Sequence, residues 1–471
     1  MKTEALSAEE SRKRLKEAGI APASRDAFIE ACIRHRLLVH SLLLGSSERL
    51  LSETYLEETG FNPLHRMFSI SKSVTALAVG CLEAEGKLSL DDKILKYFPE
   101  YAEGAHPWLQ ALTIRQMLRM ESCHLKTTYK HNPSDPWVES FFRLPPDHAP
   151  GTFFHYDTSS PHVLAALAER LSGEKLLDYL RRKGLRERGF SDEAYFLEDP
   201  QGHPMGGSGL MATSRDMLLL AQLVMQGGGA VFPEAFCREM TAFQTVTATE
   251  ASIPEESCGY GYQCWRNRRG FTFYGMGGQL AVALPEQDLI LITTADLQKS
   301  KAEMQTIFDL FFRYIADPLL PAEKAAPERE ERPVLSLPQV PDRFAPDWPS
   351  FDFSEETEAE SLRFVYNKKE ESCIRLRKNG RSFEIPFKTG EKREIFMKDT
   401  GHRAFVSAGF PGPRQLQITV QVLAEEVGRI DILAGRSQEA VALLMKNNIE
   451  RFYAPLSGVW TFPLDASEGR K

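Results

Sequence analysis

The sequence predicts an α/β protein of the α+β type, in which an antiparallel sheet with flanking helices is followed by a smaller β-rich domain. Strand-like alternation forms a hairpin at residues 37–56 and returns only at residues 260–294, with helical patterns between the two regions. Eight prolines then fall within the 32 residues from Pro318 to Pro349, a density typical of an extended linker. Short strand-like runs follow the prolines. We therefore predict a first domain at 1–317, a linker at 318–350 and a second domain at 351–471.

The composition is ordinary for a soluble globular protein. The 471 residues are too many for one hydrophobic core, and the formal net charge of −8 gives no reason to expect a nucleic-acid partner. No apolar run approaches the roughly 20 residues of a membrane helix, and the N-terminus lacks the apolar core of a signal peptide. The seven cysteines form no C-x-x-C pair, and no H-E-x-x-H occurs. We expect a cytoplasmic protein with reduced thiols, no metal, no cofactor and no membrane contact, and leave its oligomeric state open.

The elements of the first domain follow from local patterns taken in chain order. After the N-terminal hairpin, an apolar helix begins near Ser69 and ends at Gly86, a typical C-cap residue. Thr113 and Thr213 stand where N-caps of two later helices are expected. Residues 121–150 have no regular pattern, and long loops of this kind are usually functional. Strands are then expected at 260–265, 271–274, 280–284 and 289–294, and a closing helix at 302–315.

The second domain shows six short strand-like runs and one helical pattern. The strands are expected at 361–366, 373–378, 382–387, 404–407, 416–423 and 427–433. A final helix is expected at 438–445.

The start of the Ser69 helix carries the strongest chemical signal. Ser69 and Lys72 are three residues apart and therefore share one face of the helix, so the hydroxyl and the amine can meet. A serine needs a neighbouring base, and a lysine acts as a base only when burial or a nearby cation lowers its pKa. The apolar helix start can bury the lysine, and free N–H groups lie beside the serine. This pattern is that of an S-x-x-K acyl-transfer nucleophile.

The S-x-x-K pattern is short, and it occurs a second time. Ser172 and Lys175 have the same spacing but lie at the polar end of a helix with a glycine inside the motif, which is typical of a C-terminal cap. The glycines at 206–209 also have a structural alternative, because they lack the lysine of a phosphate-binding loop and fit a close-packed turn.

Two further motifs follow Ser69 in chain order. One places Tyr156 and Thr158 just before a helix, and the other is a Phe-Tyr-Gly-Met-Gly-Gly-Gln run at 273–279 on a predicted strand. With these motifs, the sequence resembles the serine β-lactamase and penicillin-binding-protein superfamily over about residues 37–317. It looks most like the branch of class C β-lactamases, type VIII carboxylesterases, D-aminopeptidases and 6-aminohexanoate-dimer hydrolases. The most specific segments are 68–73, 85–92, 207–210 and 277–279.

The resemblance implies a β-lactamase/transpeptidase-like fold. The family's antiparallel sheet has five strands, which the N-terminal hairpin and the last three strands of the first domain would form. Helices flank this sheet, and an all-helical half would contain the Ser69 helix.

The resemblance also implies roles for individual residues. Ser69 would be the nucleophile, Lys72 would take its proton, and Tyr156 would relay the proton between Ser69 and the leaving group. A tyrosine becomes a competent base only beside a cation, which Lys72 would provide. The N–H groups of Ser69 and Met276 would stabilise the oxyanion, and Gly275 would let its strand approach the acyl carbon.

The sequence departs from the family in its second and third motifs. Thr158 replaces an asparagine, and its hydroxyl can still bond the Lys72 region. Tyr274 lies in the third motif, which carries a cation in true β-lactamases and has none here. A literal Lys-Thr-Gly occurs only at 388–390, in the second domain. This pattern favours a neutral ester or amide substrate. An aromatic-walled pocket around Ser69, for which Trp137, Phe141 and Phe142 are candidates, would support such a substrate, whereas a cationic wall would favour a β-lactam.

The expected function is hydrolysis of a small-molecule ester or amide through an acyl-enzyme. Two alternatives remain: hydrolysis of β-lactams or D-amino-acid peptides, and a non-catalytic ligand-binding or regulatory protein that retains the fold. The second domain would either bind a carbohydrate or partner, or pack against the hydrolase and shape its cleft.

Overall fold

The computed structural model describes residues 4–131, 135–247, 250–298, 300–319, 337–346, 348–357, 360–423, 427–447, 453 and 455–464. By contacts, the chain divides into two compact units. The first comprises Met1–Met120, His124–Pro145 and His155–Arg329, and the second comprises Glu121–Cys123, Pro146–Phe154 and Glu330–Lys471. Much of the predicted linker lies outside the described residues.

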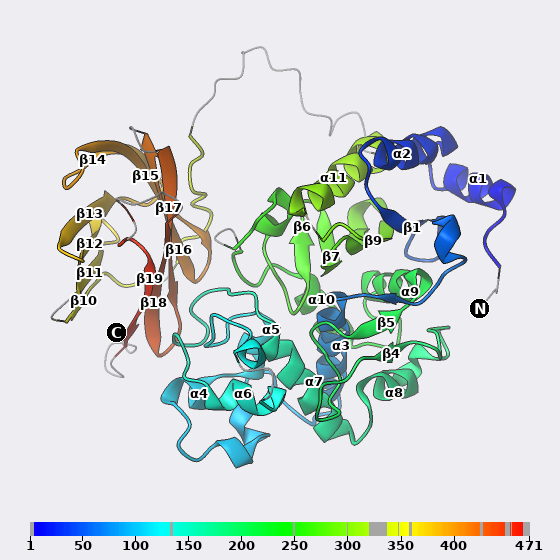
Figure 1. Ribbon diagram of the computed structural model, residues 1–471, viewed down its shortest axis with the longest axis horizontal. Coiled ribbons are helices and arrows are strands. Elements are labelled where there is room, and N and C mark those ends of the chain that lie inside the picture. Colours follow the sequence, from blue (N-terminus) through cyan, green and yellow to red (C-terminus); the bar gives the residue numbers. More distant parts are fainter. Residues whose placement is uncertain are drawn as a thin grey trace, which may run out of the picture. The chain divides into compact units, whose positions relative to one another are not determined.

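The first unit is built on a six-stranded antiparallel sheet with the strand order β2-β1-β9-β8-β7-β6 (Figure 1). Its strands are β1 (Val39–Gly45), β2 (Leu50–Tyr55), β6 (Trp265–Asn267), β7 (Gly270–Gly275), β8 (Gln279–Leu284) and β9 (Leu289–Ala295). The expected five strands are all present, and β6 adds a sixth at the edge. The strand predicted at 260–265 is wrong over most of its length, because Gln263 has a left-handed backbone and regular pairing begins only at Trp265.

Helices cover both faces of this sheet. On one face, α1 (Ala8–Glu17), α2 (Pro22–Arg34) and α11 (Lys301–Phe311) share an apolar core with the sheet, and α2 and α11 lie side by side in Figure 1. On the other face, α9 (Ser214–Met225) packs against β1, β8 and β9. The helix patterns beginning at Thr113 and Thr213 are confirmed, since both residues form capping boxes.

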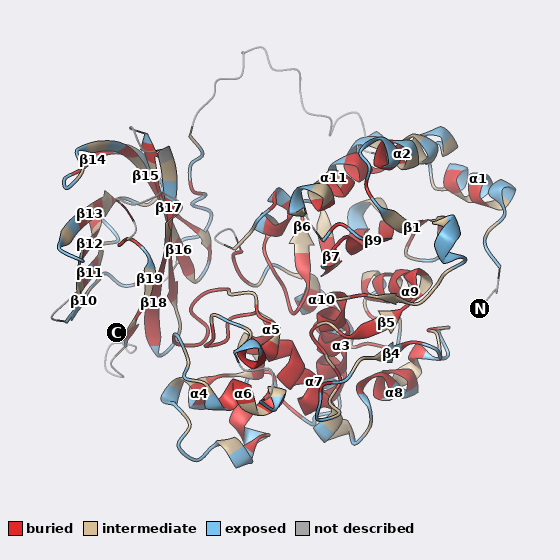
Figure 2. Cartoon of the chain, in the orientation of Figure 1, coloured by how far each residue is buried: buried red, intermediate tan, exposed pale blue. Residues whose placement is uncertain are grey.

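A helical part of the same unit surrounds α3 (Ile70–Ala84), which packs against α7 (Ser159–Ser172). Every residue of α3 from Ile70 to Leu82 is buried, and Figure 2 shows most of the helix in red. The remaining helices of this unit are α4 (Pro107–Ala111), α5 (Ile114–Leu118), α6 (Trp137–Arg143), α8 (Leu176–Leu180) and α10 (Glu234–Thr241). A small sheet, β3 (His65–Arg66), β5 (Leu210–Ala212) and β4 (Tyr195–Phe196), leads into α3.

The second unit is a meander of antiparallel strands in two sheets that share one apolar core. The first sheet contains β10 (Phe351–Glu356), β11 (Glu360–Tyr366), β12 (Ser372–Lys378) and β13 (Arg381–Phe387). The second contains β14 (Lys392–Met397), β15 (His402–Gly412), β16 (Gln415–Leu423), β17 (Val427–Arg436), β18 (Ala440–Asn447) and β19 (Gly458–Pro463). Phe353 on β10 stacks on Phe462 on β19 with ring centroids 5.2 Å apart, so the first and last strands of the meander approach each other.

One prediction for this unit is wrong. The final helix expected at 438–445 is instead strand β18, which pairs with β17 and β19. Its residues Ala440 to Met445 are all buried. A short, continuous apolar run fits a buried strand as well as a buried helix, and the two neighbouring strands decide the outcome here.

Candidate active site

Ser69 stands at the N-cap position of α3, but its side chain makes no capping bond. The side-chain oxygen of a serine at this position usually accepts a hydrogen bond from a backbone N–H of the first turn. Here Ser69 Oγ instead accepts a hydrogen bond from Lys72 Nζ at 3.0 Å. The sequence therefore predicted correctly that the helical spacing brings this hydroxyl and this amine together.

Lys72 is almost completely buried, with 1% of its surface exposed. Besides Ser69, its Nζ donates to the carbonyl oxygen of Gly207 at 2.7 Å and lies 3.4 Å from Thr158 Oγ1. The pKa of Lys72 is lowered to about 7, mainly by burial; the buried carboxylate of Asp157 opposes this change, and the nearby cation Lys130 contributes to it. A lysine in this state is neutral in a large fraction of molecules near neutral pH and can accept a proton.

Tyr156 completes the group. Its ring centroid lies 4.9 Å from Lys72 Nζ. Burial raises the pKa of Tyr156 above its ordinary value, while hydrogen bonding with the side chains of Ser69 and Trp265 acts in the opposite direction. A low lysine pKa and a high tyrosine pKa favour Lys72 as the base and a protonated Tyr156. The expectation that Lys72 acts as a cation making Tyr156 a base is therefore not favoured.

The end of β7 lies against the segment that precedes Ser69. A Cβ atom at Gly275 would stand 2.3 Å from the carbonyl oxygen of Met67, so only glycine permits this approach. Gln279 fixes the following turn, because its side-chain amide donates to Met276 O at 2.9 Å and to Ala295 O at 2.8 Å. This arrangement brings the strand end that carries Met276 beside the start of α3.

The glycine-rich turn at 206–209 is close-packed, as we expected if these glycines serve a structural turn and not a phosphate-binding loop. A Cβ at Gly206 would lie 2.3 Å from Ala165 Cβ, and one at Gly207 would lie 2.4 Å from Thr158 Cγ2. This packing presents the Gly207 carbonyl to Lys72, a role that the sequence motifs did not indicate. The run of glycines indicated only that the backbone packs closely here. It did not indicate which carbonyl group would face Lys72.

Tyr274 is turned toward α11. Its hydroxyl lies 3.5 Å from Met304 Sδ, and burial followed by the charge of Glu256 raises its pKa. Its ring lies 6.0 Å from that of Trp265, which in turn lies 5.4 Å from Tyr156. Tyr274 is thus linked to the site through Trp265, another residue that the sequence motifs did not indicate.

The three aromatic residues named as candidates for cleft walls pack against rings of the helical part. Phe141 and Phe142 are buried on α6, where Phe142 packs against Tyr101 with ring centroids 4.8 Å apart. Trp137 stacks on Tyr129 at 4.0 Å. The rings next to Tyr156 belong to Tyr260 and Trp265, with centroids 6.3 and 5.4 Å from its own.

The second S-x-x-K pattern does not form a catalytic pair. Ser172 Oγ bonds to backbone groups at the end of α7, whereas Lys175 pairs with Glu198 at 2.7 Å. In the second unit, Lys388 of the Lys-Thr-Gly run forms an ion pair with Glu391.

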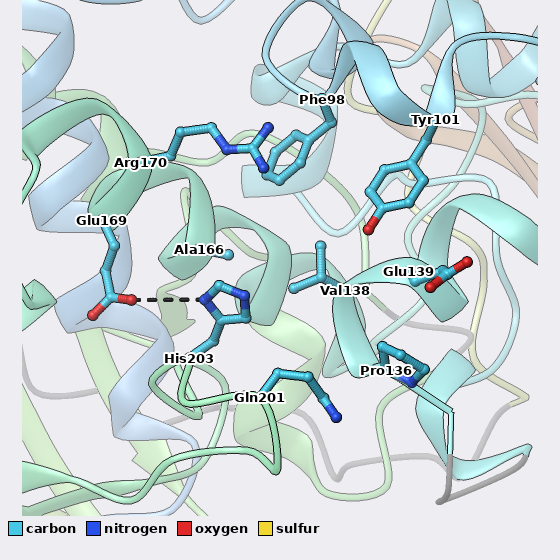
Figure 3. Close-up of a pocket in the computed structure, with 10 residues that line it drawn as sticks. All are labelled: Phe98, Tyr101, Pro136, Val138, Glu139, Ala166, Glu169, Arg170, Gln201 and His203. Atoms are coloured by element: carbon cyan, nitrogen blue, oxygen red, sulfur yellow. Dashed lines mark ion pairs between the residues drawn. The ribbon is translucent and has the colours of Figure 1, made fainter.

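A separate hollow of about 330 Å³ lies between α6 and α7 (Figure 3). None of the predicted site residues lines it. Figure 3 shows His203 directed at Glu169, with 3.7 Å between His203 Nδ1 and Glu169 Oε2, and the Arg170 guanidinium over the Phe98 ring.

Within the described part of the chain, no three His, Cys, Asp or Glu side chains gather as a metal site would require. In the same residues, no helix has the length and apolar character needed to cross a membrane.

Comparisons with known proteins define the class. The Beta-lactamase family matches residues 59–310, more than half of the chain, so the chain belongs to this family. The chain is 26% identical over 285 residues to the 6-aminohexanoate-dimer hydrolase of Paenarthrobacter ureafaciens, covering 53% of this chain and 70% of that protein. The resemblance inferred from the sequence motifs is confirmed.

Two solved structures share the fold. A Bacillus anthracis protein assigned as a 6-aminohexanoate-dimer hydrolase aligns with a TM-score of 0.51 and 18% identity, over 61% of this chain and 80% of its own. The fold is therefore shared at low sequence identity. The SurE structure aligns with a TM-score of 0.50 and 18% identity, over 87% of this chain and 97% of its own. The second match extends beyond the residues that the family covers.

Proposed function

We propose that the protein is a serine hydrolase that cleaves a small ester or amide through an acyl-enzyme on Ser69. The observation that carries the proposal is the 3.0 Å hydrogen bond between Ser69 Oγ and a buried Lys72 whose pKa lies near 7. A hydroxyl nucleophile and a neutral amine within hydrogen-bond reach form the pair that acyl transfer needs. Family membership supports the hydrolase class.

In this mechanism, Lys72 Nζ takes the Ser69 proton as Oγ bonds to the acyl carbon. The carbonyl oxygen becomes an oxyanion that accepts hydrogen bonds from the N–H groups of Ser69 and Met276. Tyr156 gives its proton to the leaving group as the bond to the acyl carbon breaks, and regains a proton from Lys72. Water then attacks the acyl-enzyme with the same groups acting in reverse, which releases the acid and restores Ser69.

The substrate is proposed to be a small molecule whose recognised part is uncharged. In the third motif, Phe273 and Tyr274 stand where true β-lactamases carry a cation, and Tyr274 turns toward Met304. The relationship to a 6-aminohexanoate-dimer hydrolase supports an amide as the first class to test. Hydrolysis of β-lactams or D-amino-acid peptides is the alternative within the same family.

The test is covalent labelling with a fluorophosphonate probe, followed by mass spectrometry of the modified peptide. We expect one adduct, on Ser69, and a burst of acyl-enzyme with p-nitrophenyl acetate. Ser69→Ala should abolish both signals, and Lys72→Met should slow them at least about 100-fold. Ser172→Ala is the matched control, because it alters the second S-x-x-K pattern and should change neither signal. Absence of any adduct on Ser69 would favour the non-catalytic alternative.

A further inference from the structure

The residue immediately before Ser69 has an unusual backbone. Phe68 has φ 46°, in the left-handed region that non-glycine residues rarely adopt. Such a conformation persists only where surrounding contacts hold it. The contacts that hold Phe68 therefore also determine the geometry at Ser69.

Ser71 supplies one of these contacts from inside the first turn of α3. Its Oγ donates to the Phe68 carbonyl oxygen at 2.6 Å and accepts from the Leu210 N–H at 2.9 Å. Ser71 is fully buried, so water cannot replace either partner. Strand β5, which contains Leu210, is also bound to Met67, whose N–H donates to Leu210 O at 2.8 Å.

The orientation of one peptide plane links these contacts to the reaction. The carbonyl of Phe68 and the N–H of Ser69 belong to the same planar peptide group and point in opposite directions. Because Ser71 binds the carbonyl, the N–H of Ser69 is directed away from Ser71. An oxyanion donor must be aimed in advance at the position where charge develops.

We propose that Ser71 is a positioning residue that aims the Ser69 N–H at the oxyanion by holding the Phe68 carbonyl. The proposal rests on the hydrolase function proposed above and adds a residue that the S-x-x-K motif does not include. The Ser71 hydroxyl acts only through the Phe68–Ser69 peptide.

The same helix provides a matched control, Ser73. Ser73 is as buried as Ser71, and its Oγ also donates to a distant carbonyl, that of Gln263 at 2.7 Å. Ser71→Ala and Ser73→Ala each remove one buried hydroxyl from α3 together with its bond to a carbonyl. Ser71→Ala also takes the acceptor from the Leu210 N–H. Only the Ser71 substitution removes a hydrogen bond from the peptide that contains the Ser69 N–H. The backbone N–H of Ser71 also donates to the Phe68 carbonyl, at 3.0 Å, and stays in place in both variants.

The experiment measures p-nitrophenyl acetate hydrolysis and fluorophosphonate labelling rates for the full-length wild type and both variants, with thermal denaturation as the folding control. Ser71→Ala should lower kcat about 10- to 100-fold with KM within about 3-fold, since losing one oxyanion donor costs roughly 100- to 1,000-fold. The pH midpoint should stay unchanged because the contacts of Lys72 remain. Ser73→Ala should keep kcat within about 3-fold, with a loss of Tm no larger than that of Ser71→Ala, and Ser71→Thr should recover most of the rate.

The outcomes separate the two proposals. Equal rate losses in Ser71→Ala and Ser73→Ala, or a Ser71→Ala effect confined to Tm, overturn the positioning role and leave the hydrolase proposal standing. A wild-type protein that forms no Ser69 adduct overturns both.

Discussion

At the residue scale, the proposed chemistry depends on how Lys72 is surrounded. Among the described residues, its hydrogen-bond partners are two hydroxyls and one carbonyl, and none is a carboxylate. The acidic group that raises its pKa is Asp157, whose carboxylate accepts hydrogen bonds from the N–H groups of Ser159 and Ser160. A buried amine without a carboxylate as hydrogen-bond partner has little to stabilise its protonated form. The exposed Lys175 of the second S-x-x-K pattern, paired with Glu198, is placed in the opposite way.

The first prediction concerns pH. Because burial lowers the pKa of Lys72 to about 7, protonated Lys72 predominates below that pH and kcat/KM should rise as pH increases through about 7. Lys130 contributes to the lowered pKa as a nearby cation, so Lys130→Glu should raise the pKa of Lys72 and move the acid limb to higher pH, by roughly 0.3 to 1 unit. The measurement is the pH dependence of kcat/KM at low ionic strength, where surface charges are least screened.

Lys126 provides the control for this prediction. It is exposed four residues before Lys130, and the charges that shift the pKa of Lys72 are those of Asp157 and Lys130, so Lys126→Glu should leave the midpoint in place. An acid limb that stays fixed in Lys130→Glu, or moves to lower pH, contradicts the proposed role of neutral Lys72.

At the element scale, the sequence predicted features that depend on neighbours along the chain. The start positions of the helices capped by Thr113 and Thr213 were predictable because each capping partner lies three residues away. The Ser69–Lys72 pair was predictable because the two residues lie one helical turn apart. Features that depend on distant neighbours were not predictable. Gly207 lies 135 residues from Lys72, and β18 is a strand only because β17 and β19 flank it.

The next prediction concerns the contact between β7 and the start of α3. Gly275→Ala would place a Cβ atom 2.3 Å from Met67 O, and a backbone oxygen cannot move aside as a flexible side chain can. We expect the strand end to move away from Ser69, with kcat at least about 10-fold lower and stability lower by about 1 to 3 kcal/mol. Steady-state kinetics and chemical denaturation measure the two effects.

Gly86→Asn is a suitable control for Gly275→Ala. Gly86 has φ 70°, a backbone that asparagine tolerates, and a Cβ atom added there would meet no described atom within 4 Å beyond its chain neighbours. Its substitution should leave kcat unchanged. A Gly275→Ala variant with wild-type kcat would show that the end of β7 does not contribute an oxyanion donor.

At the scale of the whole molecule, the chain contributes to the second unit in three places rather than one. Besides Glu330–Lys471, that unit includes Glu121–Cys123 and Pro146–Phe154. A Cβ atom at Gly435 on β17 would lie 1.5 Å from the Thr152 carbonyl oxygen, so the strand and the loop are in direct backbone contact. Sequence patterns could not predict this arrangement, because 293 residues separate Glu121 from its partner Arg414.

The last prediction concerns that ion pair. Glu121 is fully buried, and Arg414, in the turn between β15 and β16, donates to its two carboxylate oxygens at 2.6 and 2.9 Å and to Gly151 O at 3.4 Å. Arg414→Met leaves a buried carboxylate without its cation and should lower the free energy of unfolding by about 3 to 5 kcal/mol. Arg403→Met breaks an exposed pair with Glu394 and should cost at most about 1 kcal/mol. Adding Glu121→Gln to Arg414→Met removes the stranded charge and should recover part of the loss. The measurement is urea denaturation of the wild type, the two single variants and the double variant. Equal midpoints for Arg414→Met and Arg403→Met would mean that the buried pair does not hold this loop in the second unit.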